Sequence, residues 1–291
     1  MTASLVLVAT PIGNLGDLSP RAVEALAGAD LICCEDTRRT GRLLAHAGVG
    51  RGAAGRPRLR RLDEHTEAAA IPEILELLEA GAAVALVSDA GMPALNDPGA
   101  RLVAATAEAG HAVTVVPGPS AGSAALAVSG LAADRHCFEG FLPRRGEARA
   151  GRLAEIAAHE CTTVIYESPH RLAACLQDLA DACGAQRRAV VARELTKLHE
   201  EIVRGRLGEL RDWAAAGVKG EAVIVLEGAP ARHGAVADAD TGADVERLRG
   251  DVERLVSTGV TRRDAVAAVA VENRVPRRWL YNTVLRSNDR R

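Results

Sequence analysis

Long apolar runs are absent from this sequence. No stretch reaches the roughly 18 consecutive apolar residues that mark a membrane-spanning helix, and the first residues lack the basic segment of a secretory signal. The 291 residues are 48% hydrophobic and 25% charged, which is enough for a large core and, at this length, for two domains and an extra piece. We therefore expect a soluble, globular, cytoplasmic protein with no membrane contact.

Metal-binding motifs and disulfide frameworks are also missing. The chain has six cysteines, but they form no CxxC pair and show none of the histidine and cysteine spacings that zinc sites use. We expect small, reduced core residues and no metal site. The cysteines stand at positions 33, 34, 137, 161, 175 and 183.

Lysine is scarce, because only two of the 36 basic residues are lysine, Lys197 and Lys219. An ammonium group is compact and loses its proton when buried, whereas a guanidinium group stays charged. A lysine retained in such an arginine-rich chain indicates a site where arginine will not serve. We favour this interpretation for Lys197 over chance retention, and favour it less for Lys219.

Arginine supplies nearly all of the positive charge and is clustered, although the net charge is only −2. Such patches on a near-neutral protein indicate contact with a polyanion, and a solvated arginine face is the alternative. The clusters lie within residues 51–61, 144–152 and 277–291.

Three apolar runs, at 4–9, 84–87 and 112–116, each lead into a loop of glycine, proline or serine and then into a predicted helix. Such repeated units predict a mostly parallel sheet with a ligand at its carboxyl edge. The first loop has GxxG spacing, which argues against a standard dinucleotide site. The loop at 88–99 is the first candidate for binding, and a turn stiffened by its two prolines is the alternative.

A short buried strand is predicted at 30–34, with a helix at 41–47. Between them, Asp36 and Arg38 either meet a ligand at the end of the strand or serve as a helix cap and an ion pair.

The sequence pattern changes after residue 135 and predicts a second α/β domain. Phe138 and Phe141, two of only six aromatic residues, either stack on an unpaired base beside Arg144 and Arg145 or pack in the core. Strands at 200–204 and 222–227 are expected to pair in an antiparallel or mixed manner. The other expected elements are a helix at 148–158, a strand at 162–166, a helix starting within 167–171 and a strand at 189–192.

The last fifty residues predict three short helices, the third of them basic. This arrangement resembles a helix-turn-helix that contacts nucleic acid, and a dimer contact or a simple cap are the alternatives. The domains expected for the whole chain are 1–118, 119–230, a linker at 231–243 and a helical extension at 244–291.

Eight motifs are distributed between residues 9 and 228. They are ATPIGNLGDLSPRA (9–22), CEDTRRTGRLL (34–44), SDAGMPALNDPG (88–99), VPGPSA (116–121), FEGFLPRR (138–145), YESPHRL (166–172), RELTKLHEE (193–201) and KGEAVIVLEG (219–228). Together they resemble the tetrapyrrole methylase family and, within it, the ribosomal RNA small subunit methyltransferase I group. The resemblance runs from residue 4 to about 228, and the helical end resembles that group's usual extension.

The resemblance implies a two-domain tetrapyrrole-methylase-like α/β fold with a mostly parallel first sheet, a mixed second sheet and a small helical extension. It further implies S-adenosylmethionine held in a cleft between the domains, and a homodimer. The implied reaction is 2'-O-methylation of a decoding-region cytidine, cytidine 1402, in the 16S rRNA of the small ribosomal subunit.

The matching positions give expected site residues. Those expected around the cofactor are Pro11, Asp89, Ala90, Gly91, Ser120, Ala121, Glu167, Glu194 and Leu195. Those expected to contact RNA are Arg38, Arg39, Arg144, Arg145, Arg171, Arg277 and Arg278.

A ribose hydroxyl must lose its proton to attack a methyl group, so a proton acceptor or a cation beside the developing alkoxide is needed. Lys197 fits either role, as an amine with a pKa lowered by burial or as an ammonium. The alternatives are Glu167, His170, and Glu35 or Asp36.

Two other classes of protein stay open. A tetrapyrrole C-methyltransferase would not need the arginine clusters or the helical end, and a non-enzymatic nucleic-acid-binding regulator would leave the three loops unexplained.

Overall fold

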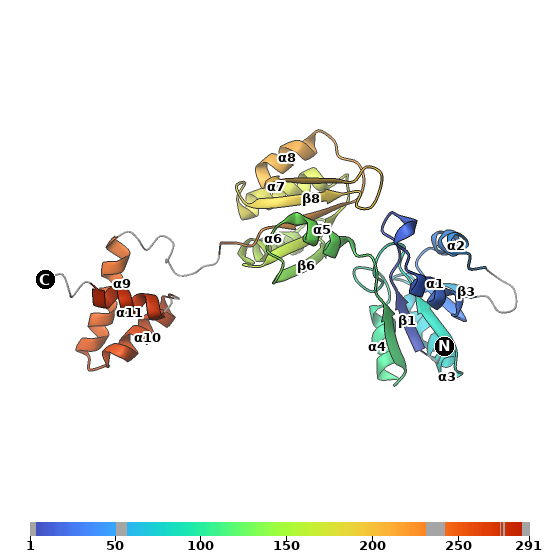
Figure 1. Cartoon of the computed structure of the whole chain (residues 1–291), viewed down its shortest axis with the longest axis horizontal. Coiled ribbons are helices and arrows are strands. Elements are labelled where there is room, and N and C mark those ends of the chain that lie inside the picture. Colours follow the sequence, from blue (N-terminus) through green and yellow to red (C-terminus); the bar gives the residue numbers. More distant parts are fainter. Residues whose placement is uncertain (1–3, 51–56, 231–241, 274, 276, 287–291) are drawn as a thin grey trace. The chain divides into compact units, whose positions relative to one another are not determined.

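The computed structural model (Figure 1) describes residues 4–50, 57–230, 242–273, 275 and 277–286, and it describes their side chains except those of 242–244, 278 and 283–286. The chain divides into two compact units, 1–227 and 228–291. Each unit is described by itself below.

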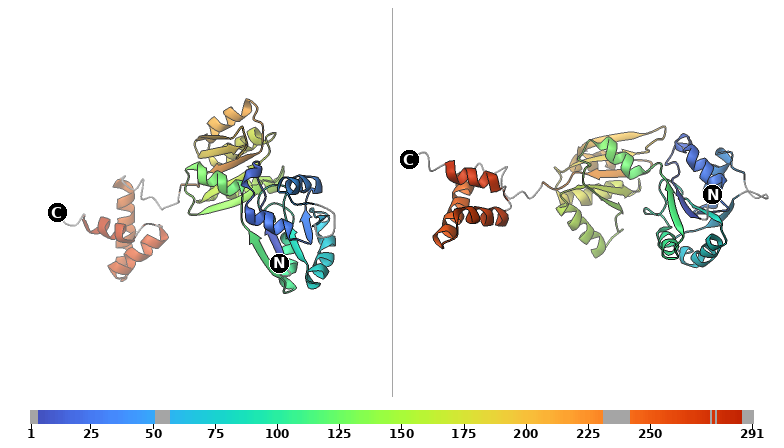
Figure 2. Two further views of the ribbon diagram at one scale, coloured as in Figure 1. Left: turned by 45° about the vertical axis from the view of Figure 1, so that its right-hand side comes forward. Right: turned by 60° about the horizontal axis from the view of Figure 1, so that its bottom comes forward.

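The first unit begins with a five-stranded, all-parallel sheet of order β3-β2-β4-β1-β5. Its strands are β1 (Ser4–Val8), β2 (Leu31–Cys34), β3 (Arg58–Arg61), β4 (Ala83–Leu86) and β5 (Ala112–Val116). The helices that connect them are η1 (Leu15–Asp17), α1 (Pro20–Ala27), α2 (Thr37–His46), α3 (Glu67–Glu79) and α4 (Ala100–Glu108). Helices α1 and α2 pack on one face and α3 and α4 on the other, so helices lie on both sides of the sheet (Figure 2). The expected mostly parallel sheet is confirmed.

Local capping decides where the first two helices begin. Ser19 caps α1, since its side chain accepts a hydrogen bond from the amide of Ala22 at 3.1 Å. The prediction of a helix at 41–47 is wrong at its start, because α2 already begins at Thr37. The carboxylate of Asp36 accepts from the amide of Arg38 at 2.8 Å, so the capping interpretation of Asp36 is the one observed.

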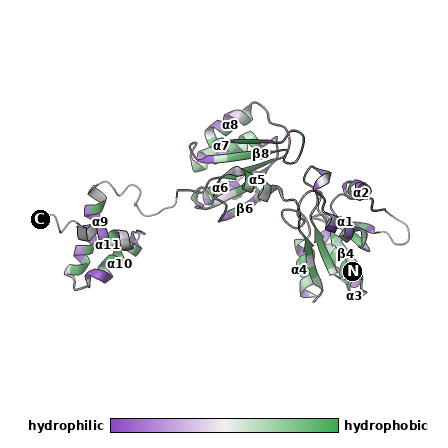
Figure 3. Cartoon of the chain, in the orientation of Figure 1, coloured by the Kyte–Doolittle hydropathy of each residue, from purple (hydrophilic) through white to green (hydrophobic). Residues whose placement is uncertain are grey.

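The second sheet is mixed, with the order β6-β7-β10-β8-β9. Its strands are β6 (His136–Phe141), β7 (Thr162–Glu167), β8 (Arg188–Arg193), β9 (Glu201–Arg206) and β10 (Ala222–Leu226). Only β6 and β7 pair in parallel, and the other pairs are antiparallel. One face is covered by α5 (Ala121–Ser129), the other by α6 (Glu147–Ala158), α7 (Leu172–Cys183) and α8 (Leu207–Ala215). Figure 3 shows the hydrophobic colouring concentrated in strands such as β4 and β8.

Two expectations for this sheet are wrong. The strands at 200–204 and 222–227 do not pair with each other, because β10 lies between β7 and β8 while β9 pairs with β8. Every residue of β10 is buried, which suits the centre of the sheet. The helix expected to start within 167–171 begins only at Leu172, because residues 168–171 form a turn closed by a bond from the amide of Arg171 to the carbonyl of Ser168.

The second unit contains α9 (Gly242–Ser257), α10 (Arg262–Glu272) and α11 (Arg277–Arg286), as the sequence predicts. They enclose a small core that includes Leu248, Val266 and Leu280. Residues 231–241 of the expected linker lie outside the described residues, and the expected domain boundaries stay a prediction. None of the helices in the described part of the chain has both the length and the apolarity of a membrane span.

A buried carboxylate holds the end of the loop at 88–99. Glu67 on α3 is 5% exposed, and its Oε1 atom accepts from the amides of Gly99 at 3.1 Å and Leu102 at 3.0 Å. Gly99 has φ of 127°, where a side chain is strained, and it offers α4 no side-chain cap of its own. Glu67 therefore supplies the cap of α4 from a neighbouring helix.

We expect Glu67→Ala to lower the free energy of unfolding by about 1–3 kcal/mol, because two buried amides lose their acceptor. Urea unfolding measures the loss. Glu76→Ala is the matched control, because Glu76 is exposed on the same helix. We expect it to change the free energy of unfolding by less than about 0.5 kcal/mol. Equal losses in the two variants would show that the Glu67 carboxylate does not secure α4.

Candidate functional site

A cavity of about 810 Å³ lies within the first unit, where the loops at the carboxyl ends of β1, β2, β4 and β5 meet residues of the second sheet. Ligands of open α/β sheets bind at this edge. The loops contribute Ile12, Glu35, Arg39, residues 89–92 and 95–97, and residues 120–123. The second sheet and its loops contribute residues that include Phe138, Phe141, Tyr166, Glu167, Glu194, Leu195, Lys197 and Glu221.

Two of these loops are joined by backbone hydrogen bonds. The amide of Thr10 donates to the carbonyl of Gly91 at 2.9 Å, and the amide of Gly91 donates to the carbonyl of Thr10 at 3.0 Å. The hydroxyls of Thr10 and Ser88 add bonds to the carbonyls of Ser88 and Gly91, both at 3.2 Å. The loops after β1 and β4 therefore form one fixed wall of the cavity.

Strained backbone is found at two loops of the cavity. Among the described residues, the non-glycine residues with positive φ are Ala94, Asn96, Glu194 and Thr196, which belong to the loops at 88–99 and 194–200. Such conformations cost on the order of 1–3 kcal/mol and persist where the surroundings hold them. The space beside Asn96 is made by Gly140, where a Cβ atom would lie 1.8 Å from the Asn96 amide nitrogen.

Asp89 ties the loop after β4 to the start of α2. Its Oδ1 atom accepts from the amide of Asp36 at 3.1 Å, and its Oδ2 atom lies 3.4 Å from a guanidinium nitrogen of Arg39. Arg39, which lines the cavity, therefore forms an ion pair with Asp89.

Acidic groups dominate this side of the cavity. Burial, and then the charges of Glu35 and Asp89, raise the pKa of Asp97 to about 6. Burial and the charge of Asp89 also raise the pKa of Glu35 above its ordinary value. Carboxylates crowded in this way favour a cationic ligand.

Lys197, in the loop between β8 and β9, lies between two carboxylates. Its Nζ atom is 2.9 Å from Oε1 of Glu194 and 3.2 Å from Oε2 of Glu221. Burial alone would lower the pKa of Lys197, but these hydrogen bonds outweigh it and raise that pKa. The side chain passes directly over Gly13, where a Cβ atom would lie 2.5 Å from its Cγ atom. Of the two roles left open by the sequence, the amine with a lowered pKa is contradicted and the ammonium remains.

Three of the six aromatic residues form part of the cavity wall. The ring of Tyr166 meets those of Phe138 at 5.1 Å and Phe141 at 5.7 Å, both edge to face. The Tyr166 hydroxyl accepts a hydrogen bond from the amide of Gly122 at 3.0 Å. Phe138 and Phe141 are 42% and 57% exposed, so the core interpretation of these two rings is wrong.

Most residues expected around the cofactor line the cavity, namely Asp89, Ala90, Gly91, Ser120, Ala121, Glu167, Glu194 and Leu195. Pro11 does not line it, although its neighbour Ile12 does. Of the residues expected for the chemistry, Lys197 and Glu167 line the cavity, and the exposed His170 does not.

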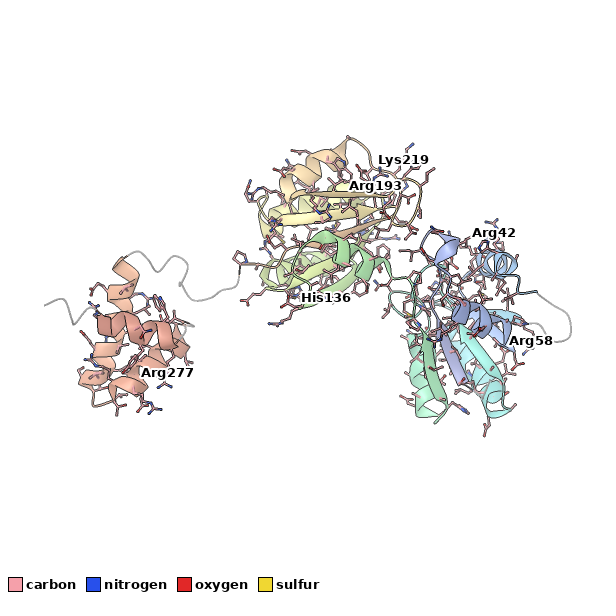
Figure 4. The ribbon with its side chains drawn as sticks, in the orientation of Figure 1. Arg42, Arg58, His136, Arg193, Lys219 and Arg277 are labelled. Atoms are coloured by element: carbon pink, nitrogen blue, oxygen red, sulfur yellow. The ribbon has the colours of Figure 1, made fainter. Side chains whose placement is uncertain are left out.

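The arginines expected to contact RNA have different surroundings. Arg39 lines the cavity, Arg38 pairs with the cap residue Asp36, and Arg171 lies 3.4 Å from the buried carboxylate of Glu167. Arg144, Arg145 and Arg277 are exposed, and Figure 4 labels Arg277 on the helical unit. The side chain of Arg278 lies outside the described part of the chain.

Sequence reasoning missed Asn96, Asp97, Tyr166 and Glu221 as cavity residues. Asn96 and Asp97 belong to the loop at 88–99, which the sequence marked as the first candidate for binding. Their place in that loop is the feature that could have identified them. Nothing in the local sequence marks Glu221 as a partner of Lys197, because 24 positions separate them.

A parallel sheet, a mixed sheet and a ligand-sized cavity at the strand ends are features of an α/β protein that binds a small molecule. The model of the family of Tetrapyrrole (Corrin/Porphyrin) Methylases matches residues 4–211. The chain belongs to this family.

Curated relatives agree with this assignment. A protein of Mycobacterium tuberculosis named ribosomal RNA small subunit methyltransferase I is 46% identical over 97% of this chain and 95% of its own length. A protein of the same name from Synechocystis is 44% identical over 97% of both chains.

Among solved structures, cobalt precorrin-4 methyltransferase has a TM-score of 0.56 at 19% identity, covering 77% of this chain and 95% of its own. Diphthine synthase has a TM-score of 0.57 at 17% identity, covering 77% and 89%. At these identities the structures show a shared fold only.

We expect Asp97→Asn to stabilise the protein at pH 8 by about 1 kcal/mol, after discounting the shift for solvent screening. The pKa of Asp97 is raised from 3.8 to about 6 in the folded state, so its ionised form destabilises the fold above pH 6. This cost disappears as the pH falls from 6 to below 4.

Urea unfolding between pH 4 and pH 8 measures the difference between the two proteins. The control is Asp212→Asn, an exposed acid paired with Arg211. A stabilisation by Asp97→Asn that does not change with pH would contradict the raised pKa.

Proposed function

We propose that the protein transfers the methyl group of S-adenosylmethionine to the ribose 2'-oxygen of a decoding-region cytidine, cytidine 1402, in 16S rRNA. The observation that carries this proposal is the identity of 46% over 97% of the chain with a relative named for the methylation of small-subunit rRNA. Its place of action is the cytoplasm, where small ribosomal subunits are found.

The cavity fits the proposed cofactor. Its volume of about 810 Å³ lies in the range of small-molecule sites. The backbone of residues 89–91, 120–121 and 194–195 would hold the cofactor, and Glu35 and Asp97 provide the negative charge that a sulfonium cation prefers. When bound, S-adenosylmethionine supplies an electrophilic methyl group.

Catalysis then depends on the positioning of the two reactants and on the removal of the proton of the ribose hydroxyl. The attack is an in-line displacement, in which the ribose oxygen bonds to the methyl carbon as the carbon–sulfur bond breaks, and orientation of the two partners supplies up to roughly 7–11 kcal/mol. Asp97 and Glu35 suit the proton acceptor, because their raised pKa values bring them closer to neutral pH. The ammonium of Lys197 suits the stabilisation of the developing oxyanion.

The surroundings of the cavity suit an unpaired nucleotide. Phe138, Phe141 and Leu95 line the cavity and are exposed, and the exposed Arg144 and Arg145 follow Phe141 within four positions. Exposed rings beside arginines are typical of surfaces that bind single-stranded RNA. We propose that this region receives the rRNA, with Arg277 and Arg278 of the helical unit as further contacts.

The proposal includes a homodimer. Strand β5 is the edge of a parallel sheet, yet its first four residues are exposed, with Val113 at 36% and Val115 at 44%. Parallel sheets are normally covered on both faces. A second copy of the chain is the partner we propose for this uncovered strand.

Labelled S-adenosylmethionine offered with assembled small subunits, deproteinised 16S rRNA or a porphyrinogen tests the function. We expect label in the rRNA, at a linkage resistant to alkali because a 2'-O-methyl group removes the attacking hydroxyl. Label in the porphyrinogen would identify a tetrapyrrole C-methyltransferase, and RNA binding without transfer would identify a regulator. Either outcome would refute the proposal.

We expect Lys197→Ala to lower turnover by at least about 10²-fold, the usual loss when one oriented donor to a developing oxyanion is removed. Cofactor affinity, measured by calorimetry, should change only a few-fold. Lys219→Ala is the control, because the side chain of this other lysine is exposed (Figure 4). Lys219 precedes β10, and only its backbone carbonyl accepts a hydrogen bond from Arg193. Near-normal turnover of Lys197→Ala would exclude a role of the ammonium in the reaction.

A further inference from the structure

One group of side chains far from each other in the sequence comes together on the second sheet. Cys137, His159 and Cys161 each offer one ligand atom, and these atoms all lie within 4.8 Å of one another. Cys137 stands on β6, His159 follows the end of α6, and Cys161 directly precedes β7. None of these residues belongs to the lining of the cavity.

We propose that Cys137, His159 and Cys161 bind a zinc ion, with Glu139 as the fourth ligand. Two thiolates and an imidazole are the ligands that Zn²⁺ prefers. In a tetrahedral site with metal–ligand bonds of about 2.0–2.3 Å, neighbouring ligand atoms lie about 3.3–3.8 Å apart. The ligand atoms of Cys137, His159 and Cys161 all lie within 4.8 Å of one another, so side-chain rotations that move them by about 1 Å would bring these three atoms into that range.

The alternation of side chains along β6 places Cys137 at this site. His136 and Phe138 line the cavity, and because successive side chains of a strand point to opposite faces, Cys137 points to the other face. The pairing of β6 with β7 is irregular between Phe138 and Gly140, so Glu139 is placed by its contacts, with Nε of Arg152 on α6 at 3.4 Å from its Oε2 atom. Glu139 is 10% exposed at its side chain, and its Oε1 atom lies 4.0 Å from Nδ1 of His159. The proposed fourth ligand therefore lies beside the third, and it is already in an ion pair with Arg152.

The sulfur atoms of Cys137 and Cys161 lie within 4.8 Å of each other. Both cysteines are half-buried, whereas Cys33, Cys34 and Cys175 are fully buried. Simple core packing explains those three residues but not this pair.

The site has a structural consequence for the cavity. Strand β6 is the edge of its sheet and pairs only with β7. A metal at Cys137 would connect β6 to the α6–β7 segment through His159 and Cys161. It would thus fix the strand that carries Phe138 and Phe141 without touching the substrate.

Titration of the full-length, chelator-treated protein with Co²⁺ and then Zn²⁺ tests the proposal directly and does not depend on methyl transfer. We expect one equivalent of Co²⁺, with the thiolate charge-transfer and tetrahedral d–d absorption bands. We also expect displacement by Zn²⁺ and a rise in Tm of several degrees. Cys137→Ser and Cys161→Ser should each weaken binding at least a hundredfold.

Cys183→Ser is the matched control, because Cys183 is equally half-buried but lies outside the group, and it should bind like the unaltered protein. His159→Gln provides a second test if a cysteine variant fails to fold, with binding again weakened at least a hundredfold. Absence of stoichiometric binding by the unaltered protein, or equal binding by the variants, would overturn the proposal. So would a Cys137–Cys161 disulfide found by mass spectrometry in the purified protein.

Discussion

Two backbone hydrogen bonds between Thr10 and Gly91 hold together the loops on which the cavity depends. Parallel pairing of β1 with β4 brings the ends of these strands to one edge, but pairing alone leaves the loops beyond it free to diverge. The reciprocal bonds extend the contact past the strands. Asp89 continues the connection to the start of α2, and Glu67 fixes the far end of the same loop at α4.

Acidic groups predominate inside the cavity, whereas the surface around it carries arginines. Inside, Glu35, Asp89 and Asp97 lie close enough to raise the pKa of two of them, an environment that favours a cation and disfavours phosphate. Outside, exposed arginines follow the aromatic wall. A positively charged methyl donor and a polyanionic acceptor would thus be separated by the electrostatics of the protein, with only the target ribose reaching the acids.

Local patterns predicted much of the fold, and contacts between distant segments account for the rest. Apolar runs specified β1, β4 and β5, because the residues that form each run are adjacent in the chain. The central place of β10 depends on sheet pairing, which no short window contains. In the site, the loop at 88–99 was evident from its glycines and prolines. The raised pKa of Asp97 and the grouping of Cys137 with Cys161 were not, because each arises from residues that only folding brings together.

The surroundings of Lys197 explain why a lysine is retained at this position of an arginine-rich chain. Its single ammonium nitrogen bonds to Glu194 and Glu221 at once, and its Cγ atom crosses Gly13 where even a methyl group would collide. A guanidinium group is planar, wider and fixed in the direction of its donors, so it would lose one carboxylate or displace the glycine loop. A chain that uses arginine for nearly every positive charge keeps lysine here, where the side chain passes over Gly13 and the ammonium lies between two carboxylates. The same constraint places a permanent positive charge directly beside the loop that follows β1.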